Sequence, residues 1–389
     1  MSLHVPRRLT LLLRIGLPLV AVSVVIVGAA LWKDTPAVAV GNERLSTVIW
    51  MVPDPALSDG DLLYGDAAVY ARISDAAGNS IVSPLGNGMR ARIVPGGSLP
   101  MVAVQTIDGD WRFLRYEAET SKWLTACSPA PGSAVKDAIQ ADGRILFQQQ
   151  EQRRTIAAVD AVTGQKADYL LPILTPDAKA GHPGDGVKMW ITDEPSPGWV
   201  GAFVSAGDRV LAFSWTGQAA AVTDLMEGRT VLLEGYSFVG DAALGGDGYV
   251  YAVVARVWEP DFGLWVLRID PATLSVLSSY ATGFSGTFNK VVAVPTPTGA
   301  AVFVSVEPVG DELVADQHMW LVDSSAIRAL QPLPRGTALW MGPAEGNAVL
   351  LYGGAAKNVV YRYDLTSQVL SEASELSAPP GAVVLAASD

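Results

Sequence analysis

Short apolar runs alternate with turns along most of the chain. Between Gly246 and Tyr280 three such runs, rich in Val, Ala, Leu and Tyr, are separated by segments that contain Gly, Asp and Pro. Runs of this length and composition are typical of β-strands. After residue 33 no apolar stripe at helical spacing continues beyond two turns. The pattern therefore predicts an all-β domain made of many short strands.

An acidic residue ends one strand in each of seven repeats along the chain. The seven acids are Asp75, Glu117, Asp160, Asp224, Asp270, Asp323 and Asp364. Successive acids are 42, 43, 64, 46, 53 and 41 residues apart, and a period of about 40 to 50 residues with several strands is typical of propeller blades. The spacing predicts a seven-bladed β-propeller, with six or eight blades as alternatives because two intervals are long. We expect the acids to accept turn N–H groups, a structural role.

The last apolar run of the chain has no unit of its own. Residues Ala382 to Ala387 read AVVLAA and follow the seventh repeat. A closed propeller leaves few exposed strand edges, and joining the two ends of the chain achieves this closure. We predict that this run completes the first blade; the alternative is that Arg44 to Val52 does so.

The N-terminal region predicts a membrane anchor. Residues 15–32 contain no charged side chain, and as a helix they would span about 27 Å, close to the hydrocarbon thickness of a bilayer. Arg7, Arg8 and Arg14 precede or border this segment, so the positive-inside rule places the N-terminus in the cytoplasm. This predicts a single-pass cell-membrane protein with an extracytoplasmic propeller. The alternative is a cleaved signal peptide and a secreted or periplasmic protein.

These features divide the chain into four parts. We expect a short cytoplasmic segment over residues 1–14, a transmembrane helix over residues 15–32 that acts as a signal anchor, a tether over residues 33–43 and the β-propeller over residues 44–389. The one cysteine, Cys127, excludes an intramolecular disulfide, and we interpret it as a small packed residue rather than a reactive thiol.

The charge balance argues against a nucleic-acid partner. All 39 acidic residues and 24 of the 27 Lys and Arg residues follow Arg14, which gives that part a net charge of −15. Nucleic-acid binding usually requires a basic surface. The membrane, through the N-terminal helix, and a protein are the partners that we expect.

One repeat resembles a known family of blades. The stretch AVDAVTGQKADYLLP, from Ala158 to Pro172, is similar to the repeat of the quinoprotein-like propellers, in which a strand ends in Asp and Thr-Gly follows. Arg268 to Leu277 and Arg362 to Leu370 carry degenerate forms. The resemblance, over residues 60–376, implies the fold and no single function. The family includes enzymes with pyrroloquinoline quinone and non-catalytic scaffolds; adjacent cysteines and a recognisable set of cofactor ligands are missing here, so its redox chemistry is not implied.

Concentrated catalytic chemistry is not evident in the sequence. The three histidines, His4, His182 and His318, are too few and too scattered to indicate a triad or a histidine-rich metal site. There is no phosphate loop, no HExxH motif and no paired-cysteine zinc spacing. Scattered carboxylates could still assemble a calcium site in a propeller.

Three long connections predict a binding face. Residues 172–187 join two blades, whereas residues 258–263 and 307–317 join second to third strands, and in an up-and-down blade these connections emerge on the same side. Insertions on one face often mark a binding surface. The candidate binding residues are Asp177, His182, Asp185, Trp258, Glu259, Asp261, Phe262, Glu307, Asp311 and Glu312.

These observations favour a non-catalytic binding or scaffold module for a protein or an envelope ligand. The first alternative is an extracytoplasmic enzyme of the calcium-dependent hydrolase or lactonase type. The second is a structural surface protein that assembles through its edges or faces. No cofactor is expected for the binding module, whereas calcium would be required by the enzyme.

Overall fold

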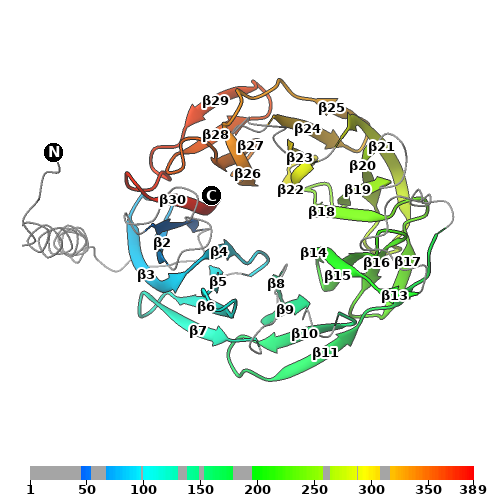
Figure 1. Cartoon of the computed structure of the whole chain (residues 1–389), viewed down its shortest axis with the longest axis horizontal. Helices are drawn as coiled ribbons and strands as arrows, with labels where there is room; N and C mark the ends of the chain where they lie inside the picture. Colours follow the sequence, from blue (N-terminus) through cyan, green and yellow to red (C-terminus); the bar gives the residue numbers. More distant parts are fainter. Residues whose placement is uncertain are drawn as a thin grey trace, which may run out of the picture.

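The computed structural model contains a closed ring of seven four-stranded antiparallel sheets (Figure 1). It describes residues 45–53, 67–97, 100–129, 138–148, 153–177, 195–256, 263–286, 288–306 and 316–389. These residues form strands and turns without any helix. In the described part of the chain no helix is long and apolar enough to cross a membrane. The predicted cytoplasmic segment, transmembrane helix and tether lie outside the described residues.

Each sheet is one blade, and the chain runs from its inner strand to its outer strand in all blades except the first. From inner to outer strand, blade 1 consists of β30 (Val383–Ser388), β1 (Ser46–Val52), β2 (Ala67–Ser74) and β3 (Ser80–Gly88); blade 2 of β4 (Arg90–Ile93), β5 (Met101–Gln105), β6 (Trp111–Glu117) and β7 (Lys122–Cys127); blade 3 of β8 (Ala138–Ala141), β9 (Arg144–Gln148), β10 (Thr155–Asp160) and β11 (Lys166–Leu170).

The second half of the ring repeats this order. Blade 4 consists of β14 (Trp199–Ala206), β15 (Arg209–Trp215), β16 (Ala220–Asp224) and β17 (Arg229–Leu232); blade 5 of β18 (Phe238–Leu244), β19 (Val250–Arg256), β20 (Gly263–Ile269) and β21 (Val276–Ser285); blade 6 of β22 (Phe288–Thr296), β23 (Gly299–Val306), β24 (Gln317–Asp323) and β25 (Ile327–Ala329); blade 7 of β26 (Ala338–Pro343), β27 (Ala348–Gly353), β28 (Val360–Asp364) and β29 (Val369–Glu372).

Seven blades confirm the predicted count. In its described part the interval of 64 residues holds the small two-stranded sheet of β12 (Ile173–Leu174) and β13 (Ser196–Pro197), between blades 3 and 4, instead of another blade. The interval of 53 residues contains β21, which at ten residues is longer than the strand it pairs with. Insertions in connections and one long outer strand therefore account for the uneven spacing.

The two ends of the described chain meet in blade 1. Strand β30 pairs antiparallel with β1, with Val383 opposite Met51 and Ser388 opposite Thr47. The predicted closure by residues 382–387 is confirmed, and β1, from the alternative segment, lies beside it in the same sheet. Blade 1 thus contains strands from both ends of the described chain, and their pairing closes the ring.

Apolar side chains pack between neighbouring blades rather than in one central core. Seven clusters of buried residues each join two adjacent blades, and together they connect all seven. Second strands are consequently buried on both faces: every residue of β19 before Arg256 is buried. Sheets covered on both faces have continuous apolar strands rather than alternating ones.

The seven acids lie at the end of the third strand of each blade or directly after it, and they open the turn to the outer strand, as predicted. Asp160 shows the geometry: one carboxylate oxygen accepts the N–H groups of Val162, at 3.0 Å, and Thr163, at 2.6 Å. Asp364 accepts the N–H groups of Thr366 and Ser367 in the same way. In Glu117 the longer side chain accepts the Thr120 hydroxyl instead, at 2.6 Å.

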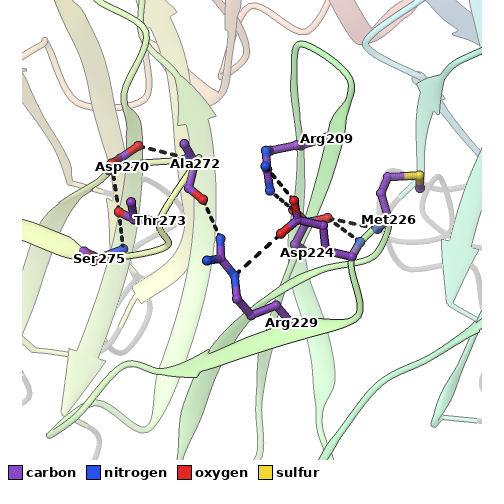
Figure 2. A network of polar contacts seen from close by, with 9 residues as sticks. Arg209, Asp224, Met226, Arg229, Asp270, Ala272, Thr273 and Ser275 are labelled. Carbon is purple, nitrogen blue, oxygen red and sulfur yellow. Dashed lines mark hydrogen bonds and ion pairs between the residues drawn. The ribbon is translucent and has the colours of Figure 1, made fainter.

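At Asp224 the turn is part of a larger polar network (Figure 2). This carboxylate is wholly buried; one oxygen accepts the Met226 and Glu227 N–H groups and the other is bonded to Arg209. Arg209 also pairs with Glu227 at 2.7 Å, and this contact lowers the pKa of Glu227. Arg229, on the outer strand of blade 4, donates to the Ala272 carbonyl in the turn of blade 5. The network joins two blades on the side of the ring opposite to the start of the inner strands.

These turns predict a loss of stability in acid. Hydrogen bonds hold the pKa values of five turn aspartates below their ordinary range, chiefly through Asn79 for Asp75, Thr163 for Asp160, Thr273 for Asp270, Ser325 for Asp323 and Ser367 for Asp364. A lowered folded-state pKa stabilises the fold above the unfolded value, near 4, and this contribution is lost as the pH falls through the folded values. We expect a level melting temperature from pH 7 to about pH 5 and a steep decline below about pH 4. Melting curves from pH 7 to pH 2 test this, and Asp364→Asn should make the decline shallower; a melting temperature unchanged down to pH 2 would contradict it.

Candidate functional site

Of the predicted binding residues, Asp177 lies in the described part of the chain. His182, Asp185, Trp258, Glu259, Asp261, Phe262, Glu307, Asp311 and Glu312 lie outside the described residues. The strands that flank segments 257–262 and 307–315 are second and third strands of blades 5 and 6. Their ends lie on the side of the ring where the inner strands begin, which we call the start face. The prediction that these residues form a binding surface stays a prediction.

Asp177 acts as an anchor for the segment between blades 3 and 4. Its carboxylate accepts the Gly235 N–H at 2.7 Å, and its own N–H donates to the Gln218 carbonyl at 3.0 Å. Gln218 lies in a turn of blade 4, and Gly235 lies in the connection to blade 5. These contacts give Asp177 a structural role at the start face.

The inner strands carry a feature that the sequence reading missed. In five blades the register between inner and second strand shifts, leaving one extra residue on the inner strand: Gly201, Gly240, Asn289, Leu339 and Leu385. Each of these β-bulges falls at the second or third residue of its strand. Bulges re-aim side chains and are frequent beside active sites. The bulges therefore favour a binding site near the start of the inner strands.

In blades 4 and 5 the bulges bring neighbouring inner strands together. Both extra residues are glycines, and a Cβ on Gly201 would lie 2.3 Å from the Val239 carbonyl oxygen. A Cβ on Gly240 would lie 3.0 Å from the Val291 side chain. These two bulges serve close packing of the ring and expose no side chain.

The bulge in blade 7, in contrast, exposes side chains to solvent. Its extra residue is Leu339, and the alternation of inward and outward side chains is interrupted there, so that Leu339 and Trp340 are both exposed, by 38% and 40%. On either side Ala338 and Met341 are buried. Two consecutive large apolar side chains thus reach solvent from an inner strand.

A lysine from the neighbouring blade completes this surface. Lys290 follows the bulge of β22 in blade 6, and its Nζ lies 4.2 Å from the centre of the Trp340 ring, a cation–π contact. We call Lys290, Leu339 and Trp340 the inner-rim site. It combines an exposed apolar surface with a positive charge at its edge.

Asp241 occupies the position after the bulge in blade 5, as Lys290 does in blade 6. Its carboxylate accepts the N–H groups of Ala293, on β22, and of Ala242, both at 2.9 Å. Asp241 therefore reaches β22 from the blade 5 side, whereas Lys290 extends from β22 toward blade 7. Asp241 and Lys290 therefore lie on opposite sides of β22 around the ring.

Aromatic side chains continue from blade 4 to blade 6 at the same level. The ring centres of Trp215 and Phe238 are 4.7 Å apart, and those of Phe238 and Phe288 are 5.6 Å apart. An aromatic residue within the first three positions of β14, β18, β22 and β26 is the sequence signal that could have indicated this region.

A larger hollow lies elsewhere on the start face, between blades 1 and 2. This cavity of about 550 Å³ is lined by Asn87, Thr106, Ile107, Asp108, Asp110, Trp111, Arg112, Ser128 and Pro129. Arg112 donates to the Asn87 carbonyl at 3.1 Å across it. A second cavity of about 230 Å³ lies on the opposite face between blades 3 and 4. Neither cavity includes a residue of the inner-rim site.

Within the described ranges no group of three or more His, Cys, Asp or Glu side chains could hold a metal ion. Burial raises the pKa of the Cys127 thiol to about 12, so this thiol stays protonated at neutral pH and is a poor nucleophile. This agrees with the interpretation of Cys127 as a packed residue.

No protein-family model matches the chain, and no curated protein sequence matches it. Several solved structures, in contrast, do match the chain. A protein from Bacteroides uniformis, provisionally named a 6-phosphogluconolactonase, superposes with a TM-score of 0.57 at 11% identity, over 88% of this chain and 98% of its own. A Bacteroides fragilis protein with the same provisional name gives 0.54 at 10% identity, over 88% and 97%. Apo AztD from Citrobacter koseri gives 0.50 at 13% identity, over 89% and 98%.

The likeness is one of fold. The superpositions establish a common propeller architecture, and at identities of 10 to 13% they carry no assignment of activity. The quinoprotein-like type suggested by the repeat at Asp160 is not singled out by these structures.

Proposed function

We propose that the chain is a non-catalytic binding or scaffold module for a protein or an envelope ligand, and that it binds through the inner-rim site. The exposure of Leu339 and Trp340 at the bulge of β26 carries this proposal. Exposed apolar residues next to a charged group are typical of binding surfaces. The bulge holds them on a rigid inner strand, and a rigid surface loses little conformational entropy on binding.

The proposal includes a membrane location. Residues 15–32 would anchor the chain as a single-pass helix with the N-terminus in the cytoplasm, and the propeller would face the extracytoplasmic side. It also keeps the quinoprotein-like assignment of the blades, supported by the way Asp160 caps its turn before Thr163. No cofactor is required for binding of this kind.

Capture by the full-length protein tests the proposed function. Wild type, Leu339→Ser and the control Val369→Ser, which changes a residue 57% exposed on an outer strand, are immobilised and incubated with an envelope extract of the source organism. We expect one component to be retained by wild type and by the control and to be lost with Leu339→Ser. The purified component should then bind wild type at least about tenfold more tightly than Leu339→Ser. Equal binding to all three proteins would contradict the proposal.

The competing hypothesis is a calcium-dependent lactonase. Two proteins of the same fold are provisionally named 6-phosphogluconolactonases, and acids outside the described residues could contribute ligands. That hypothesis predicts calcium-dependent hydrolysis of 6-phosphogluconolactone by the purified full-length chain. The binding proposal predicts the spontaneous rate of hydrolysis with or without calcium.

A further inference from the structure

We infer that Met226 is the site at which hydroperoxides oxidise the folded propeller, and that Tyr169 donates the proton that this reaction requires. The inference concerns the seam between blades 3 and 4 on the face opposite to the start face, so it is independent of the inner-rim site. It is carried by the exposure of the thioether, by the hydrogen bonds that reach it from blade 3 and by the cavity beside it.

Met226 is the most exposed methionine in the described part of the chain. Its exposed fraction is 43%, and it lies in the turn between β16 and β17. Met51, Met101, Met319 and Met341 are at most 3% exposed, and Met89 is partly buried. Because an oxidant has to contact the sulfur to form methionine sulfoxide, Met226 should react before these others.

Two hydrogen bonds lead from blade 3 to the sulfur of Met226. The Tyr169 hydroxyl, on β11, donates to this sulfur over 3.8 Å, and an Arg144 N–H, on β9, donates to the Tyr169 oxygen over 3.2 Å. In Figure 2 the Met226 side chain points away from the network around Asp224, whereas its backbone N–H is bonded to the Asp224 carboxylate. Chemistry at the sulfur therefore leaves the turn itself in place.

The cavity between blades 3 and 4 admits a small oxidant to this sulfur. Its volume is about 230 Å³, and its lining includes Arg144, Tyr169 and Met226. A water molecule occupies about 30 Å³ in the liquid, so hydrogen peroxide, with two oxygen atoms, fits into the cavity. A hydroperoxide there can contact the sulfur and the Tyr169 hydroxyl together.

The proposed reaction transfers one oxygen atom. The Met226 sulfur attacks one peroxide oxygen, the O–O bond breaks, and the departing hydroxide or alkoxide takes the Tyr169 proton and leaves as water or an alcohol. The protonated sulfoxide then returns a proton to the Tyr169 phenolate, whose negative charge the Arg144 guanidinium stabilises in the meantime. Sulfur loses two electrons and the peroxide gains them. Thiol-dependent methionine sulfoxide reductases reverse this modification.

The product is compatible with the folded ring. A thioether is a weak hydrogen-bond acceptor, whereas the sulfoxide oxygen is polar and would lie beside the Tyr169 hydroxyl that already donates to the sulfur. Oxidation of a buried methionine would instead place a polar oxygen in the apolar core. We expect protein oxidised at Met226 alone to melt within about 2 °C of the unoxidised protein.

Time courses of oxidation by hydrogen peroxide test the inference on the full-length protein. Folded and urea-unfolded samples are digested and analysed by mass spectrometry for the addition of one oxygen at each methionine. In the folded protein we expect Met226 to react at least about tenfold faster than the four buried methionines, and in urea all five should react at similar rates. Tyr169→Phe, which keeps the ring, should slow the oxidation of Met226 at least about threefold. The control Tyr280→Phe removes a hydroxyl that is bonded to the Ser324 carbonyl and should leave the rate unchanged.

The buried methionines also report whether a variant has loosened. A destabilised variant would oxidise Met51, Met101, Met319 and Met341 faster, whereas loss of the proton donor slows Met226 alone. Oxidation of Met226 in the folded protein at the rate of the buried methionines would overturn the inference. Equal rates at Met226 in wild type and in Tyr169→Phe would overturn it as well.

Discussion

Removal of residues 382–389 is expected to abolish cooperative folding of the ring. Four residues of this segment, Ala382, Val384, Ala386 and Ala387, are at most 5% exposed and belong to the apolar clusters that join blade 1 to blades 7 and 2. Their loss, together with the hydrogen bonds to β1, should cost on the order of 5 kcal/mol. Domains are typically stable by only about 5–15 kcal/mol. The truncation also leaves β1 with an unpaired edge, which favours aggregation.

Thermal unfolding followed by circular dichroism tests this expectation. The truncated protein should show no cooperative transition or should aggregate. The matched control removes Asp389 alone, which breaks an ion pair with Arg362 between side chains that are 23% and 37% exposed. Partly exposed pairs of this kind contribute little, so the control should melt within about 2 °C of wild type. A sharp, wild-type-like transition in the longer truncation would show that β30 is not the closing strand.

Replacement of Asp224 by Asn is expected to produce the largest loss of stability among the seven turn acids. Asn keeps an oxygen that can accept the Met226 and Glu227 N–H groups, so the turn itself can persist. The substitution removes the negative charge that faces Arg209. The Asp224 carboxylate that carries this charge is wholly buried. Arg209, whose side chain is 24% exposed, then loses the charge-assisted hydrogen bond that the buried carboxylate supplied. Glu227, at 2.7 Å from Arg209, offsets only part of this loss.

Asp270→Asn is the matched control for this prediction. Asp270 caps the equivalent turn of the next blade, accepting the Ala272 N–H at 2.9 Å, but no arginine is bonded to its carboxylate in the network of Figure 2. We expect Asp224→Asn to lower the melting temperature by about 5 °C and Asp270→Asn by clearly less. Equal effects of the two substitutions would mean that turn capping, and not the ion pair with Arg209, dominates at Asp224.

The architecture could be predicted because its signals are local. An aspartate that caps its own turn, such as Asp160 or Asp364, depends on the next three residues, and this requirement repeats in every blade. The closing strand could be predicted because one apolar run remained after seven units. The long intervals were ambiguous because an insertion such as β12–β13 and an additional blade both lengthen the spacing.

The inner-rim site could not be predicted in the same way. A bulge adds one residue without changing composition, and Leu339–Trp340 reads like any apolar pair. Continuous apolar runs also occur in buried second strands such as β19, so the pair alone does not indicate exposure. The contact of Lys290 with Trp340 joins two blades and is invisible to a reading of local pattern. Reasoning from loop length selected ten residues, of which Asp177 lies in the described part of the chain and proved to be an anchor.

Site-specific photo-crosslinking tests most directly the claim that the inner-rim site binds a ligand. Benzoylphenylalanine is placed at position 339, and at position 369 as the control, in the full-length protein within its source cells, which are then irradiated. We expect a discrete crosslinked product from position 339 that is absent from position 369 and disappears when Trp340→Ala is introduced. No product from position 339, or the same products from both positions, would contradict it.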